Sequence, residues 1–490
     1  MQGRFISGRE LAAVPRRIIR GFKPLSVWLV SLVISGCIGT DGIKPQGSVL
    51  PVESLATDQA IQSADRDANW PAGQWWRVYG DPQLERWITR ATQDSPSLAM
   101  AAARVRQARA LAGIAESAEA LHIDSNASLA RHSWPSDQFY GPGALANTRT
   151  WDNNATLGLS YALDLWGRES NASEQALDLA HMSVAEQRQA QLELQENIVR
   201  AYIQLALHYA RLDIAEATLA QQQQILDLAQ RRLKGGIGTH FEVSQAETPL
   251  PETHRQLDEL EEAIALDRNQ LAVLAGKGPG EGATLQRPSL SLHTALKLPS
   301  ALPAQLLGQR PDVVASRWCV EAQARGIDVA RAGFYPNVDL VASLGYMATG
   351  GGMLEFLTGT KLTYKAGPAI SLPIFDGGRL RAELGQAVAG YDLAVAHYNQ
   401  TLVTALKNIS DQLIRRASMD KQQVFAAESV ASAQKTYDIA LIAYRRGLTD
   451  YLNVLNAQTL LFRQQQIQQQ IEAARLSVYA GLAVALGGSL

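Results

Sequence analysis

Two long helical patterns dominate the chain. From Gly167 to about Lys234 there is no proline and no internal glycine, and apolar residues recur at steps of three, four and seven. Such periodicity predicts an amphipathic helix, which at about 1.5 Å per residue would be about 100 Å long. A second stretch with the same pattern runs from Arg379 to about Arg446. Helices of this length favour coiled-coil packing.

Each long pattern ends at glycine, at Gly235-Gly236 in the first and at Gly447 in the second. Glycine just past the last turn is a common helix stop, because it accepts the left-handed backbone conformation. Helical periodicity then resumes over 242–275 and over 452–486. The sequence therefore predicts a tight turn and a returning helix after each long helix.

Between the helices lie four short segments with apolar residues on one face and small or polar residues on the other. They are 123–130, 154–164, 337–346 and 362–372. This alternation is typical of transmembrane barrel strands, although an antiparallel sheet with one wet face shows it as well. In a membrane every strand edge must be paired, so four strands per chain predict that several chains close one barrel. Three chains would supply twelve strands, an even number within the usual range.

The chain contains an internal repeat. Gly167 corresponds to Gly378 and Gly236 to Gly447, each at a separation of 211 (378 − 167 and 447 − 236), and 243–248 match 454–459 at the same separation. A period this long indicates a duplicated domain, not a solenoid. We assign 70–275 to a first unit (strands about 122–164), 276–300 to a linker, and 301–490 to a second unit (strands about 337–374).

The first 36 residues have the features of a signal peptide. Cationic side chains up to Lys23 precede an apolar stretch over 25–35, which is too short for a membrane span. Residues 34–37 (Ile-Ser-Gly-Cys) look like a bacterial lipobox, so Cys37 is predicted to carry a covalent lipid such as palmitate; a plain secretory signal is the alternative. Residues 37–69 lack periodicity and are rich in Gly, Pro, Ser, Thr and Asp, which predicts a lipidated flexible tether.

Several motifs carry a resemblance to a known family. They are 309–313 (Gln-Arg-Pro-Asp-Val), 330–337 (Ala-Arg-Ala-Gly-Phe-Tyr-Pro-Asn), 367–379 (Gly-Pro-Ala-Ile-Ser-Leu-Pro-Ile-Phe-Asp-Gly-Gly-Arg), Trp75-Trp76 and 81–84 (Asp-Pro-Gln-Leu). From about Trp75 onward the chain resembles the TolC-type outer-membrane efflux family, specifically its lipoprotein (NodT- and OprM-like) branch. The stretch 367–399 looks most like branches linked to fusaric-acid or aromatic-acid export.

The resemblance implies an α+β membrane protein. Each protomer of a homotrimer would give four strands to a 12-stranded transmembrane β-barrel and long coiled-coil helices to a tunnel in the periplasm. The protein would be lipid-anchored and membrane-spanning in the cell outer membrane. Its partners would be a periplasmic adaptor (membrane fusion) protein, an inner-membrane pump of RND, MFS or aromatic-acid exporter type, and outer-membrane lipid. It would passively conduct drugs or other small toxic compounds delivered by that pump, as in multidrug resistance.

The resemblance also implies two functional sites. Asp411 matches an acidic constriction at the periplasmic end of the tunnel, with Arg415 and Lys407 nearby; three copies would form a carboxylate ring that favours cations. An exposed i,i+4 pair of Asp411 with Arg415 is the alternative interpretation. The helix tips resemble the adaptor-contacting turns, although simple helix reversal also explains their glycines. The tip residues are Gly236, Ile237, Gly238, Thr239, Gly447, Leu448 and Thr449.

Composition indicates neither an enzyme nor a nucleic-acid-binding protein. The net charge of −2 provides no basic field. The eight histidines have no metal-ligand spacing, and no Gly-x-Ser-x-Gly elbow is present. No cofactor is predicted beyond the lipid on Cys37, and Cys319 is predicted to be a packed residue without a disulfide. Two other functions stay open, a lipid-anchored periplasmic coiled-coil adaptor or scaffold and a TolC-type conduit for peptide or protein secretion.

Overall fold

A computed structural model describes residues 40, 42–51, 55, 73–135, 145–290 and 310–488. The predicted signal peptide, Cys37, residues 56–69 of the predicted tether and residues 291–300 of the predicted linker lie outside this range. Among the described residues, no helix has the length and apolar character needed to cross a membrane.

Both units share the order helix, strand, strand, long helix and returning helix. The first consists of η2 (Trp75–Tyr79), α3 (Pro82–Asp94), α4 (Pro96–Ser117), β1 (His122–Ser133), β2 (Arg149–Leu163), α5 (Arg168–Lys234), α6 (His240–Glu247), α7 (Pro249–Leu274) and α8 (Pro279–Gly282). The second consists of α10 (Pro311–Ala332), β3 (Asn337–Thr349), η4 (Glu355–Leu357), η5 (Gly359–Lys361), β4 (Leu362–Ser371), α11 (Arg379–Arg445) and α12 (Tyr451–Ala485).

The repeat is visible in the lengths and spacing of these elements. The long helices α5 and α11 have 67 residues each and begin 211 apart (379 − 168). At about 1.5 Å per residue each is about 100 Å long, as the periodicity predicts. The preceding helix and the first strand of each unit are related by 215 instead, since α10 follows α4 by 311 − 96 and β3 follows β1 by 337 − 122.

The first returning helix differs from the prediction of one continuous helix over 242–275. It is divided into α6 and α7, and Pro249 and Pro251 lie at the start of α7. Proline has no backbone N–H to donate to the preceding turn and its ring crowds the carbonyl there, so it ends or kinks a helix. The second returning helix, α12, has no proline and is continuous.

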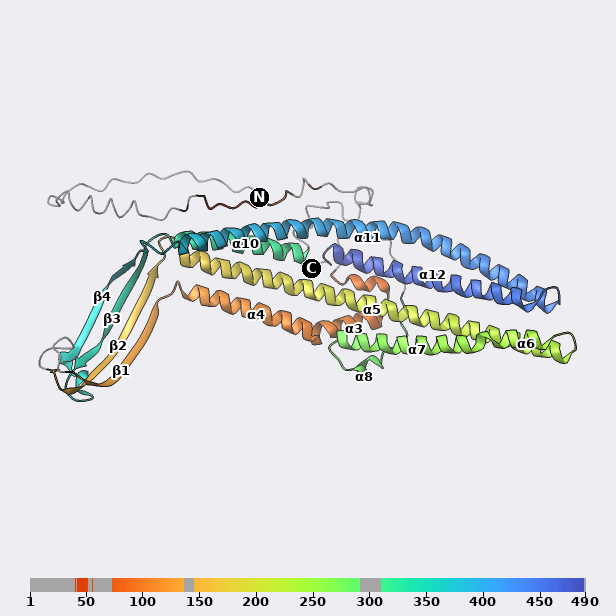
Figure 1. Cartoon of the computed structure of the whole chain (residues 1–490), viewed down its shortest axis with the longest axis horizontal. Helices are drawn as coiled ribbons and strands as arrows, with labels where there is room; N and C mark the ends of the chain where they lie inside the picture. Colours follow the sequence, from red (N-terminus) through yellow and green to blue (C-terminus); the bar gives the residue numbers. More distant parts are fainter. Residues whose placement is uncertain are drawn as a thin grey trace.

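The four strands form one antiparallel sheet in the order β1-β2-β3-β4. The sheet extends from one end of the helices and bends away from them (Figure 1). The register places Ile123 opposite Leu159, and Leu157 opposite Leu344. One face of the sheet is therefore apolar and the other carries small or polar side chains, as the alternation predicts. Within the chain, β1 and β4 each keep one unpaired edge.

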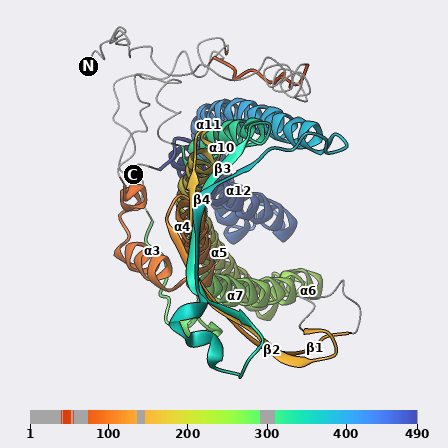
Figure 2. The same ribbon diagram turned by 90° about the vertical axis from the view of Figure 1, so that its left-hand side faces the viewer.

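The helices stand side by side in an open curved wall (Figure 2). Contacts between them give the order α4–α5–α10–α11 in the half next to the sheet and α7–α5–α12–α11 in the other half. Helix α11 therefore forms one edge of the wall, and α4 and α7 form the other. The outer helices of the wall are connected to the outer strands of the sheet, because α4 is followed by β1 and β4 is followed by α11.

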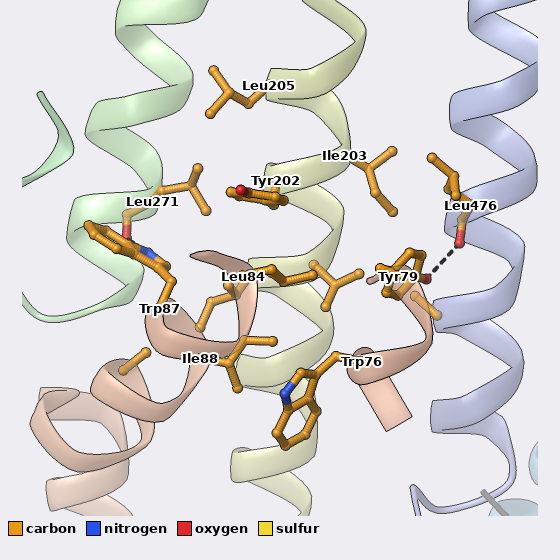
Figure 3. Packing of buried hydrophobic residues seen from close by; sticks show 14 of the residues in the cluster. Trp76, Tyr79, Leu84, Trp87, Ile88, Tyr202, Ile203, Leu205, Leu271 and Leu476 are labelled. Atoms are coloured by element: carbon orange, nitrogen blue, oxygen red, sulfur yellow. Dashed lines mark hydrogen bonds between the residues drawn. The ribbon is translucent and has the colours of Figure 1, made fainter. Parts of the chain in front are cut away.

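The largest core lies where η2 and α3 cross the wall (Figure 3). Trp87 packs toward α7 and donates its indole N–H to the Leu271 carbonyl at 3.2 Å. On the other side, Tyr79 donates its hydroxyl to the Leu476 carbonyl of α12 at 2.8 Å. Burying each large apolar side chain contributes about 1.5–3 kcal/mol. This core therefore fastens the two units to each other through α5.

Asp81 organises the polar margin of this core. Its Oδ1 caps α3 by accepting from the Gln83 N–H at 2.8 Å. Its Oδ2 accepts from the Tyr202 hydroxyl of α5 and from the Ser289 N–H, both at 2.8 Å. These donors take the place of the water molecules that a buried carboxylate loses. The motif 81–84 therefore has a structural role.

Residues 42–51, which the sequence predicts to be part of a flexible tether, are instead held on α11. Asp392 Oδ1 accepts from the backbone N–H groups of Gln46 at 2.9 Å and Gly47 at 2.7 Å. The Asn399 amide accepts from the Leu50 N–H and donates to the Ser48 carbonyl, both at 2.9 Å. The prediction failed because these bonds go to backbone groups, which leave no periodic pattern in the sequence. We call residues 42–51 the strap.

Candidate functional site

The sheet has an exposed apolar face. One row across it is Leu157, Leu344 and Tyr364, which are paired in register and all exposed, with Tyr364 at 81%. The row beside it, on the other face, includes Gly158 and Ser343. Soluble monomers seldom leave such a large apolar patch in water. An apolar face backed by a small, polar one suits a sheet with lipid on one side and water on the other.

Aromatic side chains mark the junction between the sheet and the helices. Trp166 stacks on Tyr335 with ring centroids 4.6 Å apart and planes 17° apart, and its indole donates to the Pro336 carbonyl at 2.8 Å. Both rings are about half exposed, and Phe375, in the segment between β4 and α11, is almost fully exposed. Tryptophan and tyrosine gather where a membrane protein passes from lipid to water. This junction therefore has the chemistry of a bilayer surface.

The wall contains one seam inside the chain, where the first unit meets the second. Leu192 and Ile203 of α5 are buried there, Ile203 at 2% exposure, and Figure 3 shows Ile203 and Leu476 of α12 in this region. Their counterparts on α11 are Val403 (192 + 211) and Ile414 (203 + 211), which are exposed, Ile414 at 54%. The same helical face is covered in the first unit and bare in the second.

The bare face of α11 forms an apolar stripe. Val403, Ile414 and Phe425 follow at steps of 11 residues and are all exposed. Eleven residues are close to three helical turns, so the three side chains lie in line. The opposite edge of the wall also carries exposed apolar side chains, on α4 and α7. They are Met100, Leu111, Ile114, Leu266 and Val273.

The two helix tips are built alike and lie at the end of the molecule away from the sheet (Figure 1). Gly236 and Gly447 have φ angles of +75° and +73°, which glycine adopts without strain. The next residue donates its N–H back into the helix, Ile237 to the Arg232 carbonyl at 3.0 Å and Leu448 to the Ala443 carbonyl at 2.9 Å. Helix reversal thus explains these two glycines.

Reversal does not explain the apolar side chains at the tips. Ile237 and Leu448 are 70% and 76% exposed, and each has an exposed apolar neighbour four residues later, Phe241 and Leu452. The neighbouring turns are closed by polar caps, Thr239 with Glu242 on α6 and an aspartate on α12. Each tip therefore presents a pair of exposed apolar side chains to its surroundings.

Arg232 joins the two tips and was not identified from the sequence. It donates to the Ile237 carbonyl of its own tip at 3.4 Å and to the Tyr444 carbonyl of the other at 3.3 Å. Its guanidinium also lies 5.0 Å from the centre of the buried Tyr444 ring, a cation–π distance. The repeat could have pointed to it, because the matching residue in the second unit is Ala443 (232 + 211).

The residues predicted to form the gate lie together near the middle of α11. Lys407 donates to Asp411 at 2.6 Å, and this bond, together with the charges of Lys407 and Arg415, lowers the pKa of Asp411. Arg445, the last residue of α11, is 34 residues beyond Asp411 (445 − 411), which corresponds to about 51 Å of helix. The structure thus separates Asp411 from the helix tips, whereas the resemblance implies a constriction at the periplasmic end.

The remaining candidate chemistry is sparse. No group of three or more His, Cys, Asp or Glu side chains in the part of the chain that the structure describes could hold a metal ion. Cys319 is a free, half-buried thiol, and burial raises its pKa, so it is a poor nucleophile at neutral pH.

Comparison with known proteins agrees with this geometry. The model of the outer membrane efflux protein family matches residues 87–277 and 302–488, one match in each unit. Fusaric acid resistance protein FusA of Burkholderia cepacia is 53% identical over 371 residues, which cover 76% of this chain and 70% of that protein. Pyoverdine export outer membrane protein OpmQ of Pseudomonas aeruginosa is 29% identical over 95% of this chain and 97% of that protein.

Solved structures show the same fold. The outer membrane protein VceC of Vibrio cholerae superposes with a TM-score of 0.80 at 33% identity, covering 86% of this chain and all of that one. The outer-membrane channel OprN superposes with a TM-score of 0.81 at 27% identity, covering 90% of this chain and 99% of that one. The sheet of four strands and the paired long helices are therefore those of a TolC-type channel protomer. From its sequence, fold and relatives, this chain belongs to the outer membrane efflux protein family, whose members are passive channels and not enzymes.

Proposed function

We propose that three copies of this chain close into one channel that exports small toxic compounds across the outer membrane. The supporting observation is that both sides of the chain are left open. Strands β1 and β4 each have an unpaired edge, and the apolar stripe on α11 is exposed. The second unit of one copy would meet the first unit of the next as the two units meet inside the chain. Three copies of a four-stranded sheet then give a barrel of twelve strands, in which every edge is paired.

The apolar tips are the proposed docking surface for a periplasmic adaptor protein. Ile237 and Leu448 project at the end with the least core to cover them. An adaptor would link this end to an inner-membrane pump, which supplies the energy and selects the compound. The channel needs no bond chemistry for this role, since a water-filled duct accepts what the pump delivers.

The exported compound is proposed to be a small aromatic acid. The most extensive support is the 53% identity to a protein named for fusaric acid resistance, and the stretch 367–399 carries the same resemblance. The matching pump would be of the aromatic-acid exporter type, with a pump of RND or MFS type as the alternative.

Asp411 is proposed to line a constriction, at mid-length of the tunnel and not at the tips. Its bond to Lys407 places a cation and an anion on consecutive turns of α11, and three copies would repeat this pair around the duct. Rings of charged side chains are one way in which a channel restricts passage through its duct.

Cys37 is proposed to carry the lipid that holds each copy in the outer membrane. Its position after Ile-Ser-Gly supports acylation. A Cys37→Ser variant should no longer incorporate labelled palmitate yet should still form trimers. An unmodified Cys37 in the parent protein would rule out this anchor.

The decisive experiment compares assembly with export in one strain. Expressed in a Gram-negative host that lacks its own homologue, the chain should appear in the outer-membrane fraction as SDS-resistant, heat-modifiable trimers. With its neighbouring pump and adaptor genes it should raise the inhibitory concentration of fusaric acid several-fold. Monomers in the periplasm would instead support an adaptor or scaffold, and export of a peptide without fusaric acid resistance would support a secretion conduit.

A further inference from the structure

We propose that the strap, residues 42–51, seals the seam between neighbouring copies by filling a gap between α11 of its own copy and α4 of the next. The proposal rests on the ring proposed above. It adds a role for an N-terminal segment that the sequence predicts to be only a tether.

The strap is held close against α11 by its backbone. Asp392 and Asn399 bind four backbone groups of the strap, so its position does not depend on its side chains. A Cβ atom on Gly47 would lie 3.1 Å from Asp392 Oδ1 and 3.2 Å from the Val395 side chain. A side chain at this position would push α11 and the strap apart by a few tenths of an ångström, so glycine keeps the strap close to the helix here.

Apolar side chains fix the path of the N-terminal segment on both sides of these bonds. Ile43 packs against the cluster of Ile327, Leu384 and Val388 near the sheet end of α10 and α11. Leu55 packs against a second cluster between the same two helices. The strap and Leu55 thus lie along α11 at the edge of the wall, where the proposed next copy begins.

The seam inside the chain shows what normally fills this place. The counterpart of Asp392 in the first unit is His181 (392 − 211), on α5. Its ring lies 4.6 Å from that of Trp318 on α10, with an interplanar angle of 49°. Two aromatic rings therefore fill the space between the units at this level.

Neither ring is present at the seam between copies. Asp392 replaces the histidine, and the counterpart of Trp318 on α4 is Ala103 (318 − 215), which is exposed. A carboxylate and a methyl group are much smaller than an imidazole and an indole, so equivalent packing leaves a gap. The strap is bound to that same carboxylate, and its Val49 side chain is 47% exposed. We infer that Val49 lies against α4 of the next copy.

Cysteine pairs test the seal. Val49→Cys combined with Ala103→Cys, in a Cys319→Ser background that keeps Cys37, should give disulfide-linked dimers and trimers on non-reducing gels. A link within one chain is not expected, because the strap and Ala103 lie at opposite edges of the wall. The matched control is Ile414→Cys with Ala265→Cys, the counterparts of Ile203 and Leu476 (203 + 211 and 476 − 211). This pair reports the assembly of three copies into a ring without involving the strap.

The two pairs separate the proposals. Links from both pairs support the seal. Links from the control pair alone would overturn the proposed seal but not the proposed ring of three copies. Links from neither pair would overturn the proposed ring itself.

A second test introduces the aromatic residues of the seam inside the chain at the matching positions of the seam between copies. Asp392→His with Ala103→Trp should fill the gap with rings and displace the strap, so that proteinase K releases the acylated N-terminal segment from intact trimers several-fold faster. Asp438→His, an exposed aspartate further along α11, is the control and should not change the rate. Protection of the segment equal to that of the parent protein would contradict the proposal.

Discussion

The two units carry an ion pair at the same place, with the charges exchanged. In the first unit Glu196 pairs with Arg200 at 2.6 Å, and in the second Lys407 pairs with Asp411 at 2.6 Å. Both pairs span one helical turn, and both positions are related by 211 (407 − 196 and 411 − 200). The duplication has kept the geometry while the sign of each charge has reversed. In a ring of three copies, acidic and basic side chains would therefore alternate, and the charge at this level would sum to zero.

A second difference concerns the apolar positions that share one helical face. Ile203 is buried by α12 of its own chain, whereas Ile414 is exposed. Both are isoleucine, so the sequence of the helix does not distinguish them. What differs is the source of the partner, which is the second unit for α5 and, in the proposed ring of three copies, a neighbouring copy for α11. One interface would then be used twice, once within a chain and once between chains.

The largest expected effect comes from placing a charge at these two positions. Ile203→Asp should prevent folding, because an ionised carboxylate in a core without partners is very unfavourable. Ile414→Asp should leave the monomer folded but abolish SDS-resistant trimers. Gel mobility and circular dichroism of both variants measure this contrast. Trimers of Ile414→Asp at parent yield would refute the shared interface.

A milder form of the same comparison uses alanine. Ile203→Ala should lower the free energy of unfolding of the chain by about 2–5 kcal/mol, and Ile414→Ala by less than about 0.5 kcal/mol in a monomeric form, as for a surface residue. Denaturant titration of detergent-dissociated monomers tests both values. Equal losses would show that α11 is covered within its own chain.

The tips should be affected next. Each tip has a pair of exposed apolar side chains, and Ile237→Asp and Leu448→Asp each place a charge in one of these pairs. Each should reduce fusaric acid resistance at least several-fold without lowering the amount of trimer, because docking needs apolar contact and assembly does not involve the tips. Ala427→Asp, at an exposed position of α11 outside the stripe of Val403, Ile414 and Phe425, serves as control. Full resistance in both tip variants would exclude the tips from docking.

Removing the contact by which Arg232 joins the two helix tips should have a smaller effect. Arg232→Ala gives the first unit the residue that the second has, and removes the contact to Tyr444. Spin labels at Ile237→Cys and Leu448→Cys in a Cys319→Ser background should then show a broader distance distribution. Arg231→Ala is the control, since Arg231 is exposed and pairs with Asp227 of its own helix. A distribution unchanged from the parent would show that the core below already fixes both tips.

The smallest effect is expected at the exchanged ion pair. Asp411→Ala leaves Lys407 unpaired and should raise the resting single-channel conductance. The pKa of Asp411 is held below its ordinary value of 3.8 by Lys407, so the parent pair should persist as pH falls to about 5 and break only below that ordinary value. Planar bilayer recordings test both statements. Unchanged conductance in Asp411→Ala would remove this residue from the constriction.

Much of the architecture could be predicted from periodicity. A 67-residue helix has one repeating geometry, so its apolar pattern and the glycine after it determine its extent almost residue by residue. The four strands were equally clear, because strict alternation survives only where the two faces of a sheet meet different solvents. The break at Pro249 was missed, although proline is visible in the sequence, because periodicity continues across it.

The strap and Arg232 could not be predicted in this way. Asp392 and Asn399 bind backbone groups about 350 positions away in the sequence, and a backbone group has the same chemistry at every residue. Arg232 is one of several cationic residues at the end of α5, and only the approach of the other tip distinguishes it from Arg231.

The sequence by itself determined the duplicated unit, the lengths of the long helices, the alternation of the strands and the glycine turns. Local physics suffices for these features, since each depends on neighbours within a few helical turns or strand residues. The tertiary structure alone decided which helical faces are covered, which edges stay open and where the strap lies. Those features depend on contacts between distant segments, and burial of a side chain is a property of its neighbours and not of its own identity.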